Sequence, residues 1–423
     1  MIFPCTLTVW NIGGSIKKSD IAIMGIIIAV ALTVRFIGIG HGFPFIYHSD
    51  EPAVIRSALS IRFDLNPHHF DWPHLYFYVN YLVFMVFARF RDVIASMGIK
   101  PLITQTAPVI YNDNLIFYLL SRILSATLGA LTVIPLYLWI KKLVSKKAGI
   151  LASIFFALAP FHVRHSHYAL IDVPMLFFLC WSLFFSTFSP ILAGLFLGFS
   201  ASAKYNGLLG GVFITAFYLL RKTKPLTKRV VDILNLGLFT IVGFLIGTPY
   251  ALLDYKTFLR TDGPQGALWQ FTNVGKVGLI HHIEQFSNTL IIKLPNDLGY
   301  GAAALFVVAS IILIQGIITK KAWRKIIGFS VITFLALTYY VSGLLRNPSH
   351  YYMIVYPYFF MTIGYSASLV LDKIKPPLYK IAFLILVLVP SLLLSVQNIN
   401  DLKNKRSDKI YGGDIIKDVK INP

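Results

Sequence analysis

A series of apolar runs, most of them near the length that crosses a bilayer as a helix, constrains this 423-residue chain more than any other feature. About 20 apolar residues span the hydrocarbon core. Only 13% of the residues are charged, about half the share of a soluble domain. We therefore expect an all-α polytopic membrane protein, and we exclude a soluble enzyme, a disordered regulator and a small secreted scaffold. The expected spans lie near 21–40, 115–140, 148–164, 173–189, 190–205, 207–220, 233–253, 298–319, 326–345, 351–371 and 380–396.

Short clusters of Lys and Arg between these runs set the expected orientation, because such clusters mark the cytoplasmic side. The net charge of +20 therefore does not call for a nucleic-acid partner. The two long loops, 41–114 and 254–297, are expected outside the cytoplasm. All clusters share one side only if the ambiguous run 75–90 lies on the outer membrane surface instead of crossing. This gives about eleven spans, with the N-terminus inside and the C-terminus outside. The clusters are Lys17/Lys18, Lys141/Lys142/Lys146/Lys147, Arg221/Lys222/Lys224/Lys228/Arg229, Lys320/Lys321/Arg324/Lys325 and Lys373/Lys375/Lys380.

Ionisable residues beside apolar runs carry most of the functional information, because a charge buried in lipid is costly. The first group, His48-Ser49-Asp50-Glu51, comes just after the first run. Its adjacent carboxylates could supply a general base and a second group that binds a metal, holds an acceptor or orients the base. A solvated turn capping a helix that begins at Pro52 explains the same residues, and the local pattern alone slightly favours it.

A second group lies between the third and fourth expected spans, at residues 164–172. Asp172 there is a natural helix cap, and Arg164 could snorkel to lipid headgroups. Those explanations account for single residues, but less well for the crowding of a cation, two imidazoles, a phenol and a carboxylate. Such a mixture suits recognition of a phosphate and a sugar together. The members are Arg164, His165, His167, Tyr168 and Asp172.

Two later cations complete the candidate groups. Lys204 interrupts an apolar stretch and needs a partner, water or an anion. Arg346 comes just before His350 and Tyr351, at the start of another run. Snorkelling is the alternative explanation for both cations, and it is the simplest one for Arg35, near the outer end of the first run.

Signals for a metal or cofactor are weak. The pairs His68/His69 and His281/His282 could bind a divalent metal, but without a clear ligand spacing a hydrogen-bonding or surface role is favoured. Cys5 and Cys180 are far apart and imply no disulfide framework or thiolate zinc site. The sequence has no P-loop, dinucleotide fingerprint, HExxH helix or GxSxG elbow. We expect no certain cofactor and leave a divalent metal open.

In this order, the groups resemble GT-C glycosyltransferases that use polyprenyl-phosphate sugars, a family that includes protein O-mannosyltransferases and the lipid A aminoarabinose transferase. His48 to Pro52 resembles the acidic motif after the first span, and His167 to Asp172 the acidic motif of the second loop. Lys204-Tyr205-Asn206-Gly207 resembles the lysine turn. The resemblance covers roughly residues 20–372. Its other landmarks are Asn66-Pro67-His68, Trp72-Pro73, Ser121-Arg122-Ile123-Leu124-Ser125, Gly247-Thr248-Pro249-Tyr250, and Arg346 with His350-Tyr351 and Tyr356-Pro357.

The resemblance implies a GT-C fold, with interfacial helices in the first outer loop. It implies a multi-pass enzyme of the cell membrane that moves a hexose or pentose, with inversion, from undecaprenyl or dolichyl phosphate to an acceptor hydroxyl on the extracytoplasmic face. At the matching positions, the resemblance implies that Asp50 is the general base and that Glu51 orients the acceptor or the base. It implies that the donor or acceptor is positioned by Asp172, His165, His167 and Tyr168. It also implies that the phosphate is bound by Lys204, Arg346, His350 and Tyr351.

The implied partners are the polyprenyl-phosphate sugar, membrane lipids and an acceptor protein, lipid or glycan. Residues 1–372 would form the catalytic module, and 373–423 the last span with a short polar tail. Two other classes stay open: a secondary transporter or flippase of lipid-linked or anionic substrates, and a non-catalytic subunit of a glycan-assembly complex. Transporters tend to bind substrate near the membrane midplane, whereas these groups gather at outer ends, which favours the transferase.

Overall fold

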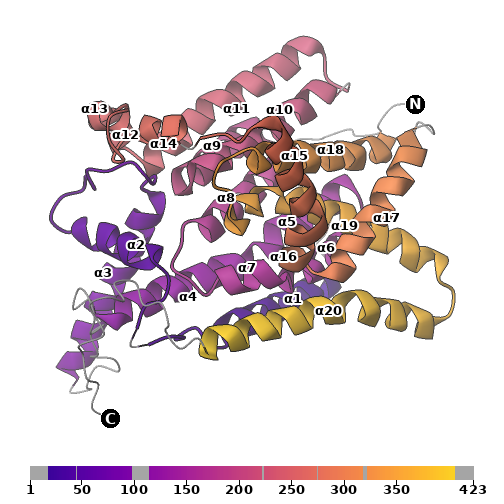
Figure 1. The fold of residues 1–423 in the computed structure, drawn as a ribbon, viewed down its shortest axis with the longest axis horizontal. Coiled ribbons are helices and arrows are strands. Elements are labelled where there is room, and N and C mark those ends of the chain that lie inside the picture. The colour runs from indigo at the N-terminus through magenta and orange to yellow at the C-terminus, as the bar shows by residue number, and fades with distance from the viewer. Residues whose placement is uncertain are drawn as a thin grey trace.

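Helices form the whole architecture in the part of the chain that the computed structural model describes, residues 18–43, 45–97, 114–221, 223–273, 275–317 and 322–404 (Figure 1). Between described residues the structure has an isolated β-bridge that joins Lys276 and Leu344. The predicted all-α class is confirmed. Lys17, Lys222, Lys320, Lys321, the segment 98–113 of the first outer loop and the tail from 405 lie outside the described residues.

The helices follow the expected spans closely. The first half of the chain holds α1 (Lys18–Phe36), α2 (Asp50–Ser60), α3 (Leu75–Ser96), α4 (Leu115–Leu131), α5 (Val133–Leu143), α6 (Lys146–Ala157), α7 (Pro160–His165), α8 (Asp172–Phe185), α9 (Pro190–Ala203), the 3₁₀ helix η1 (Tyr205–Leu209) and α10 (Gly210–Leu220). The second half holds α11 (Leu226–Gly247), α12 (Tyr250–Leu253), α13 (Tyr255–Phe258), α14 (Ala267–Asn273), α15 (Leu279–Asn288), the π-helical turn η2 (Thr289–Lys293), α16 (Leu294–Leu298), α17 (Tyr300–Ile317), α18 (Ala322–Ser342), the 3₁₀ helix η3 (Ser349–Val355), α19 (Tyr356–Lys373) and α20 (Pro377–Asn404).

The exact number of membrane spans is not confirmed. In the described ranges, four helical stretches are long and apolar enough to cross a bilayer: Leu115–Leu143, α11, Ser349–Lys373 and α20. Several shorter apolar helices, including α8 and α9, coincide with other expected spans. The expected run 148–164 is broken, because Pro160 lacks a backbone donor and cannot continue α6.

The core of the bundle surrounds α19. Nearly all of its side chains are buried, including Tyr356, Tyr358 and Phe360. Gly364 lets α19 approach α6 closely, since a Cβ there would overlap the carbonyl oxygen of Ala148. By contrast, α11 and α20 keep most of their apolar side chains exposed. This is the distribution expected of peripheral helices that face lipid.

Helices α9 and α11 pack backbone to backbone through glycines spaced four apart. Gly194 and Gly198 lie on α9, and Gly243 and Gly247 on α11. A Cβ at Gly198 would overlap the carbonyl oxygen of Thr240, and one at Gly243 that of Leu195. Small residues at this spacing let membrane helices approach closely. The contact fixes the end of α9 beside the end of α11, where a hydrogen bond of 2.6 Å joins Ser202 Oγ and Thr248 Oγ1.

The lysines of the cluster at 141–147 pair with carboxylates at the start of α1 and at the end of α19. Asp20 at the start of α1 pairs with Lys141 and Lys146, and Lys147 pairs with Asp372 at the end of α19. The turn between α19 and α20 is at the opposite end of the molecule from α2 and α3 (Figure 1). This arrangement agrees with the prediction that the clusters share one side.

The expected snorkelling of Arg35 is wrong. Its side chain is fully buried between α1 and the α6–α7 junction. The guanidinium donates to the carbonyl oxygen of Ala157 at 2.9 Å and lies 2.9 Å from His162 Nδ1. The break before Pro160 frees carbonyl groups at the end of α6, and Arg35 satisfies them.

The ambiguous run 75–90 forms α3, a helix of 22 residues. One face contributes Tyr76, Phe77 and Phe84 to a cluster shared with α2 and α4. Another face leaves Val86 and Phe90 about 60% exposed. The helix itself is confirmed. Its placement on the outer membrane surface stays a prediction, which the exposed apolar stripe supports.

Candidate active site

A buried ion pair joins the second loop to the lysine turn. Asp172 is the first residue of α8, and Lys204 follows the last residue of α9 in an extended conformation. Lys204 Nζ donates to Asp172 Oδ1 at 2.5 Å, while His165 Nε2 lies 3.2 Å from the other carboxylate oxygen. The two acceptor atoms of Asp172 therefore hold a cation and an imidazole in fixed positions.

The start of η3 closes over this pair. The ring of His350 stacks on that of His165, with a centroid distance of 5.5 Å and an angle of 18°. Lys204 Nζ lies 4.5 Å from the centre of the Tyr351 ring, a cation–π distance. Side chains separated by almost 190 positions in the sequence are thus in direct contact.

The first acidic group faces the same cluster. His48 interacts electrostatically with both His165 and Asp172, and its ring centre is 4.8 Å from that of Tyr168. Asp50 begins α2, accepts a hydrogen bond of 3.1 Å from Ser49 Oγ and is half-buried. Its charge also acts on Tyr351. Asp50 is therefore an accessible carboxylate at the edge of the cluster.

Glu51 has different surroundings from its neighbour. It is fully buried, and both carboxylate oxygens accept hydrogen bonds of 2.7 Å from the guanidinium of Arg122 on α4. The backbone N–H of Ala169 donates to Oε1 at 2.9 Å. A direct action of Glu51 on the acceptor or the base does not fit this geometry, because its oxygens are already occupied. It ties α2 to α4 and to the second loop.

Two further predicted residues lie at the margins. His167 is buried, and its ring nitrogens lie 2.8 Å from the carbonyl oxygen of Val163 and 3.0 Å from that of Ile37, so it holds the loop in place. Arg346 is exposed and acts electrostatically on Tyr351. It makes no hydrogen bond to another residue of the described chain, which leaves its guanidinium available to an anion.

The two outer loops join beside the cluster. Asn66 Nδ2 donates to Asp254 Oδ2 at 2.9 Å, and Tyr205 Oη donates to the carbonyl oxygen of Phe70 at 2.8 Å. Thr248 Oγ1 accepts the backbone N–H of His74 at 3.1 Å. The sequence landmarks around 66–73 and 247–250 are therefore parts of one interface, which contacts the lysine turn through Tyr205.

The paired histidines make local contacts in the structure. His68 Nε2 lies 2.6 Å from Asp64 Oδ2, and His69 Nε2 lies 2.9 Å from Ser57 Oγ. His281 Nδ1 lies 3.3 Å from Glu284 Oε2. Among the described residues, no group of three or more His, Cys, Asp or Glu side chains has an arrangement that could hold a metal ion.

Comparison with known proteins points to glycosyltransferases. The profile of the family "Oligosaccharyl transferase STT3, N-terminal" matches residues 114–188. Dolichyl-phosphate-mannose–protein mannosyltransferase 1 of Saccharomyces cerevisiae is 30% identical over 152 residues, which cover 32% of this chain and 18% of the yeast protein. This chain thus spans less than a fifth of that relative. Both matches fall short of the whole chain.

Solved structures resemble nearly the whole chain in fold. The oligosaccharyltransferase of Archaeoglobus fulgidus with a tethered acceptor peptide matches with a TM-score of 0.60 at 12% identity, over 96% of this chain and 60% of that one. ArnT of Cupriavidus metallidurans bound to undecaprenyl phosphate matches with a TM-score of 0.55 at 10% identity, over 91% of this chain and 76% of that one. These similarities define a helical membrane-glycosyltransferase architecture.

The chain therefore has the GT-C glycosyltransferase fold, as the order of its motifs predicts.

Proposed function

We propose that this protein is an inverting glycosyltransferase of the cell membrane that moves a sugar from a polyprenyl-phosphate donor to an acceptor hydroxyl on the extracytoplasmic side. One observation carries the proposal. Segments starting at residues 48, 165, 204 and 346 converge on a cluster with an accessible carboxylate, Asp50, beside a lysine, histidines and an exposed arginine. The fold comparison and the undecaprenyl phosphate bound to ArnT support it.

In the proposed reaction, Asp50 accepts the proton of the acceptor hydroxyl while the hydroxyl oxygen attacks the anomeric carbon. The bond between that carbon and the phosphate oxygen breaks, and the polyprenyl phosphate leaves with the electron pair. A positioned general base of this kind contributes about 10²–10⁴-fold to the rate. Asp50 suits the role because it is the carboxylate of the acidic motif that is not held by a guanidinium.

The leaving phosphate gains negative charge, which positioned cations stabilise. Lys204 is held by Asp172 and by the Tyr351 ring, so it needs little reorganisation when the phosphate arrives. Arg346 supplies a second cation, and His350, whose ring stacks on that of His165, donates a hydrogen bond to the phosphate. Glu51, through Arg122, fixes the helix that begins with Asp50 and acts as a positioning residue.

The proposal is tested with purified protein in nanodiscs supplied with a panel of polyprenyl-phosphate sugars, following release of polyprenyl phosphate. We expect Asp50→Asn to lose about 10²–10⁴-fold in turnover while donor affinity is kept. Asp262→Asn is the matched control, since Asp262 is an exposed outer-loop carboxylate paired with Arg260. Full turnover in the Asp50 variant would remove Asp50 from the reaction.

The phosphate site is tested separately by donor affinity. Arg346→Ala removes an exposed guanidinium that makes no hydrogen bond to another described residue, so we expect weaker donor binding by roughly tenfold, the loss of one charged hydrogen bond. Arg260→Ala is the control, because Arg260 is an exposed arginine of the second outer loop. An unchanged affinity in the Arg346 variant would place the phosphate elsewhere.

A further inference from the structure

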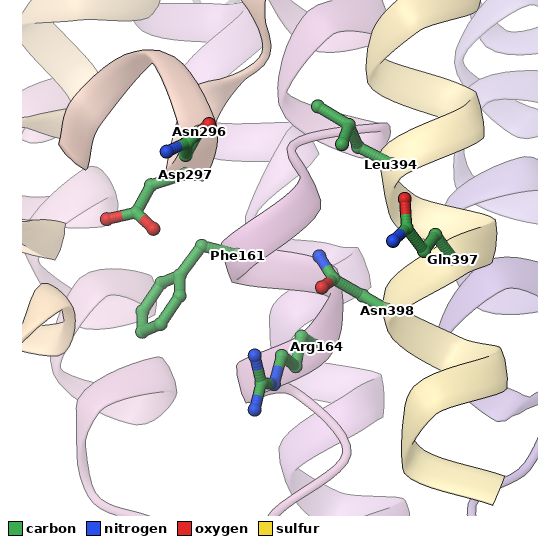
Figure 2. A pocket seen from close by; sticks show the side chains of 7 residues that line it. All are labelled: Phe161, Arg164, Asn296, Asp297, Leu394, Gln397 and Asn398. Carbon is green, nitrogen blue, oxygen red and sulfur yellow. The ribbon is translucent and has the colours of Figure 1, made fainter. Parts of the chain in front are cut away.

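A polar pocket lies beside the candidate active site and has no part in the proposed reaction. It has a volume of about 220 Å³ and is enclosed by α7, α16 and α20 (Figure 2). Phe161 and Arg164 come from α7, Asn296 and Asp297 from α16, and Leu394 from α20. The α20 side also provides Gln397 and Asn398.

The polar groups of this pocket are only partly satisfied within the protein. Asp297 Oδ2 is buried without a hydrogen-bond partner. The side chains of Gln397 and Asn398 make no hydrogen bond to another residue in the described ranges, and in Figure 2 both extend from α20 toward the α7 side of the pocket. The pocket therefore offers donors and acceptors to an occupant.

The mixture of groups favours hydroxyls over a phosphate. Three carboxamides each carry donors and acceptors. The single cation, Arg164, interacts with the carboxyl group of Asp297, which offsets its charge toward an anion. The pocket also includes an aromatic ring, that of Phe161. Planar polar side chains with one aromatic ring suit a sugar ring, which presents many hydroxyls and apolar C–H edges.

An open apolar groove lies along the end of α6 and the neighbouring part of α20. It has a volume of about 330 Å³ and is lined only by aliphatic side chains, Leu158 at the end of α6 and a face of α20 from Ile381 to Leu392. Leu394, two residues further along α20, begins the polar pocket. Ser395 Oγ donates to the carbonyl oxygen of Leu158 at 2.9 Å and holds α20 against the end of α6.

We propose that the α6–α7 edge and α20 together bind a glycolipid, with the hydrocarbon tail against the face Ile381 to Leu392 and the sugar head between Arg164, Asp297 and Asn398. An amphipathic occupant explains why aliphatic and polar linings follow each other along one helix. It also matches the exposed, lipid-facing position of α20. Phe161 stacks on His165, so the head lies one side-chain layer from the candidate active site.

Binding is measured by photo-crosslinking, which needs no turnover. The wild type is placed in phosphatidylcholine nanodiscs that contain a monoglucosyl diacylglycerol with a diazirine in its tail. The same diazirine tail on plain diacylglycerol and on phosphatidylglycerol provides the comparison lipids. We expect the glucosyl lipid to label α20 between Ile381 and Leu392 at least several-fold more than either comparison lipid.

Paired variants test the polar pocket. The double variant Gln397→Ala with Asn398→Ala should reduce labelling by the glucosyl lipid about tenfold, as the loss of two neutral hydrogen bonds implies. Asn400→Ala, an exposed amide on the same helix outside the pocket, should leave it unchanged.

Three outcomes would overturn the proposal: equal labelling by plain diacylglycerol, stronger labelling by phosphatidylglycerol, or no effect of the double variant. Asp50→Asn should label like the wild type, so a failure of the proposed reaction and a failure of this site are distinguished.

Discussion

At the residue scale, the buried pair of Glu51 and Arg122 is a contact on which the site depends. Burial disfavours the charged form of Glu51, but the Arg122 guanidinium outweighs this and holds the pKa of the carboxyl group below its usual value. Arg122→Ala would leave a buried carboxylate without its cation, which typically costs about 3–5 kcal/mol. We expect a clearly lower thermal unfolding temperature in detergent.

Arg91→Ala is the control for that measurement, since Arg91 forms an exposed pair with Asp92 and should contribute at most about 1 kcal/mol. Similar unfolding temperatures for the two variants would show that the Glu51–Arg122 pair does not stabilise the fold.

Asp297 should make stability depend on pH in the mildly acidic range. Burial raises the pKa of Asp297 to about 6 in the folded state, against about 4 in the unfolded chain. The neutral carboxyl group therefore stabilises the fold below pH 4, and this contribution is lost as the pH rises through 6. At pH 7.5, Asp297→Asn should have a free energy of unfolding up to about 3 kcal/mol higher than the wild type and therefore unfold at a higher temperature. Between pH 4 and 6, the variant should not show the loss of stability that the ionisation of Asp297 causes in the wild type. A variant less stable at pH 7.5 would contradict the assignment.

Single residues also show where prediction from sequence ends. The sequence identifies Asp50, Asp172 and Lys204 as candidates because charge is scarce in an apolar chain. It does not pair Glu51 with Arg122, since the two are 71 positions apart and only the packing of α2 on α4 joins them. The position of Arg35 near the end of the first run predicts snorkelling, but the carbonyl groups that it binds are freed by a helix break more than 120 positions away.

At the element scale, the contact of α9 with α11 positions the lysine turn. A leucine at Gly198 would collide with the backbone of α11 and push α9 away. We expect Gly198→Leu to reduce thermal stability and to lower any transferase activity, because Lys204 follows α9 directly. Gly237→Leu is the matched control on α11, since no atom lies within 4 Å of a Cβ at that exposed position. Equal behaviour of the two variants would argue against close helix packing as the reason for these glycines.

The elements themselves are well predicted by hydropathy, and their boundaries less so. Helix α3 matches the run 75–90 and extends six residues beyond it. Hydropathy predicts one span over 148–164, but Pro160 divides it into α6 and α7. The turn between these helices lies in a long apolar stretch, so hydropathy alone does not reveal it. That break frees the carbonyl groups that accept hydrogen bonds from Arg35, and it begins α7, which forms one wall of the polar pocket.

At the scale of the whole molecule, the orientation in the membrane decides which compartment supplies the acceptor. The pairs of Asp20 with Lys146 and of Lys147 with Asp372 hold the starts of α1 and α6 beside the end of α19, whereas the ion pair of the candidate active site lies at the start of α8 and the end of α9. Lys and Arg are retained on the cytoplasmic side, so we expect the site to face outward.

In intact cells, a membrane-impermeant maleimide should label Asp262→Cys directly and Lys375→Cys only after permeabilisation. Both variants are made in a Cys5→Ser background that keeps the buried Cys180. Both positions are exposed, so accessibility within the fold is matched. The reverse pattern would put the site in the cytoplasm and exclude an extracytoplasmic acceptor.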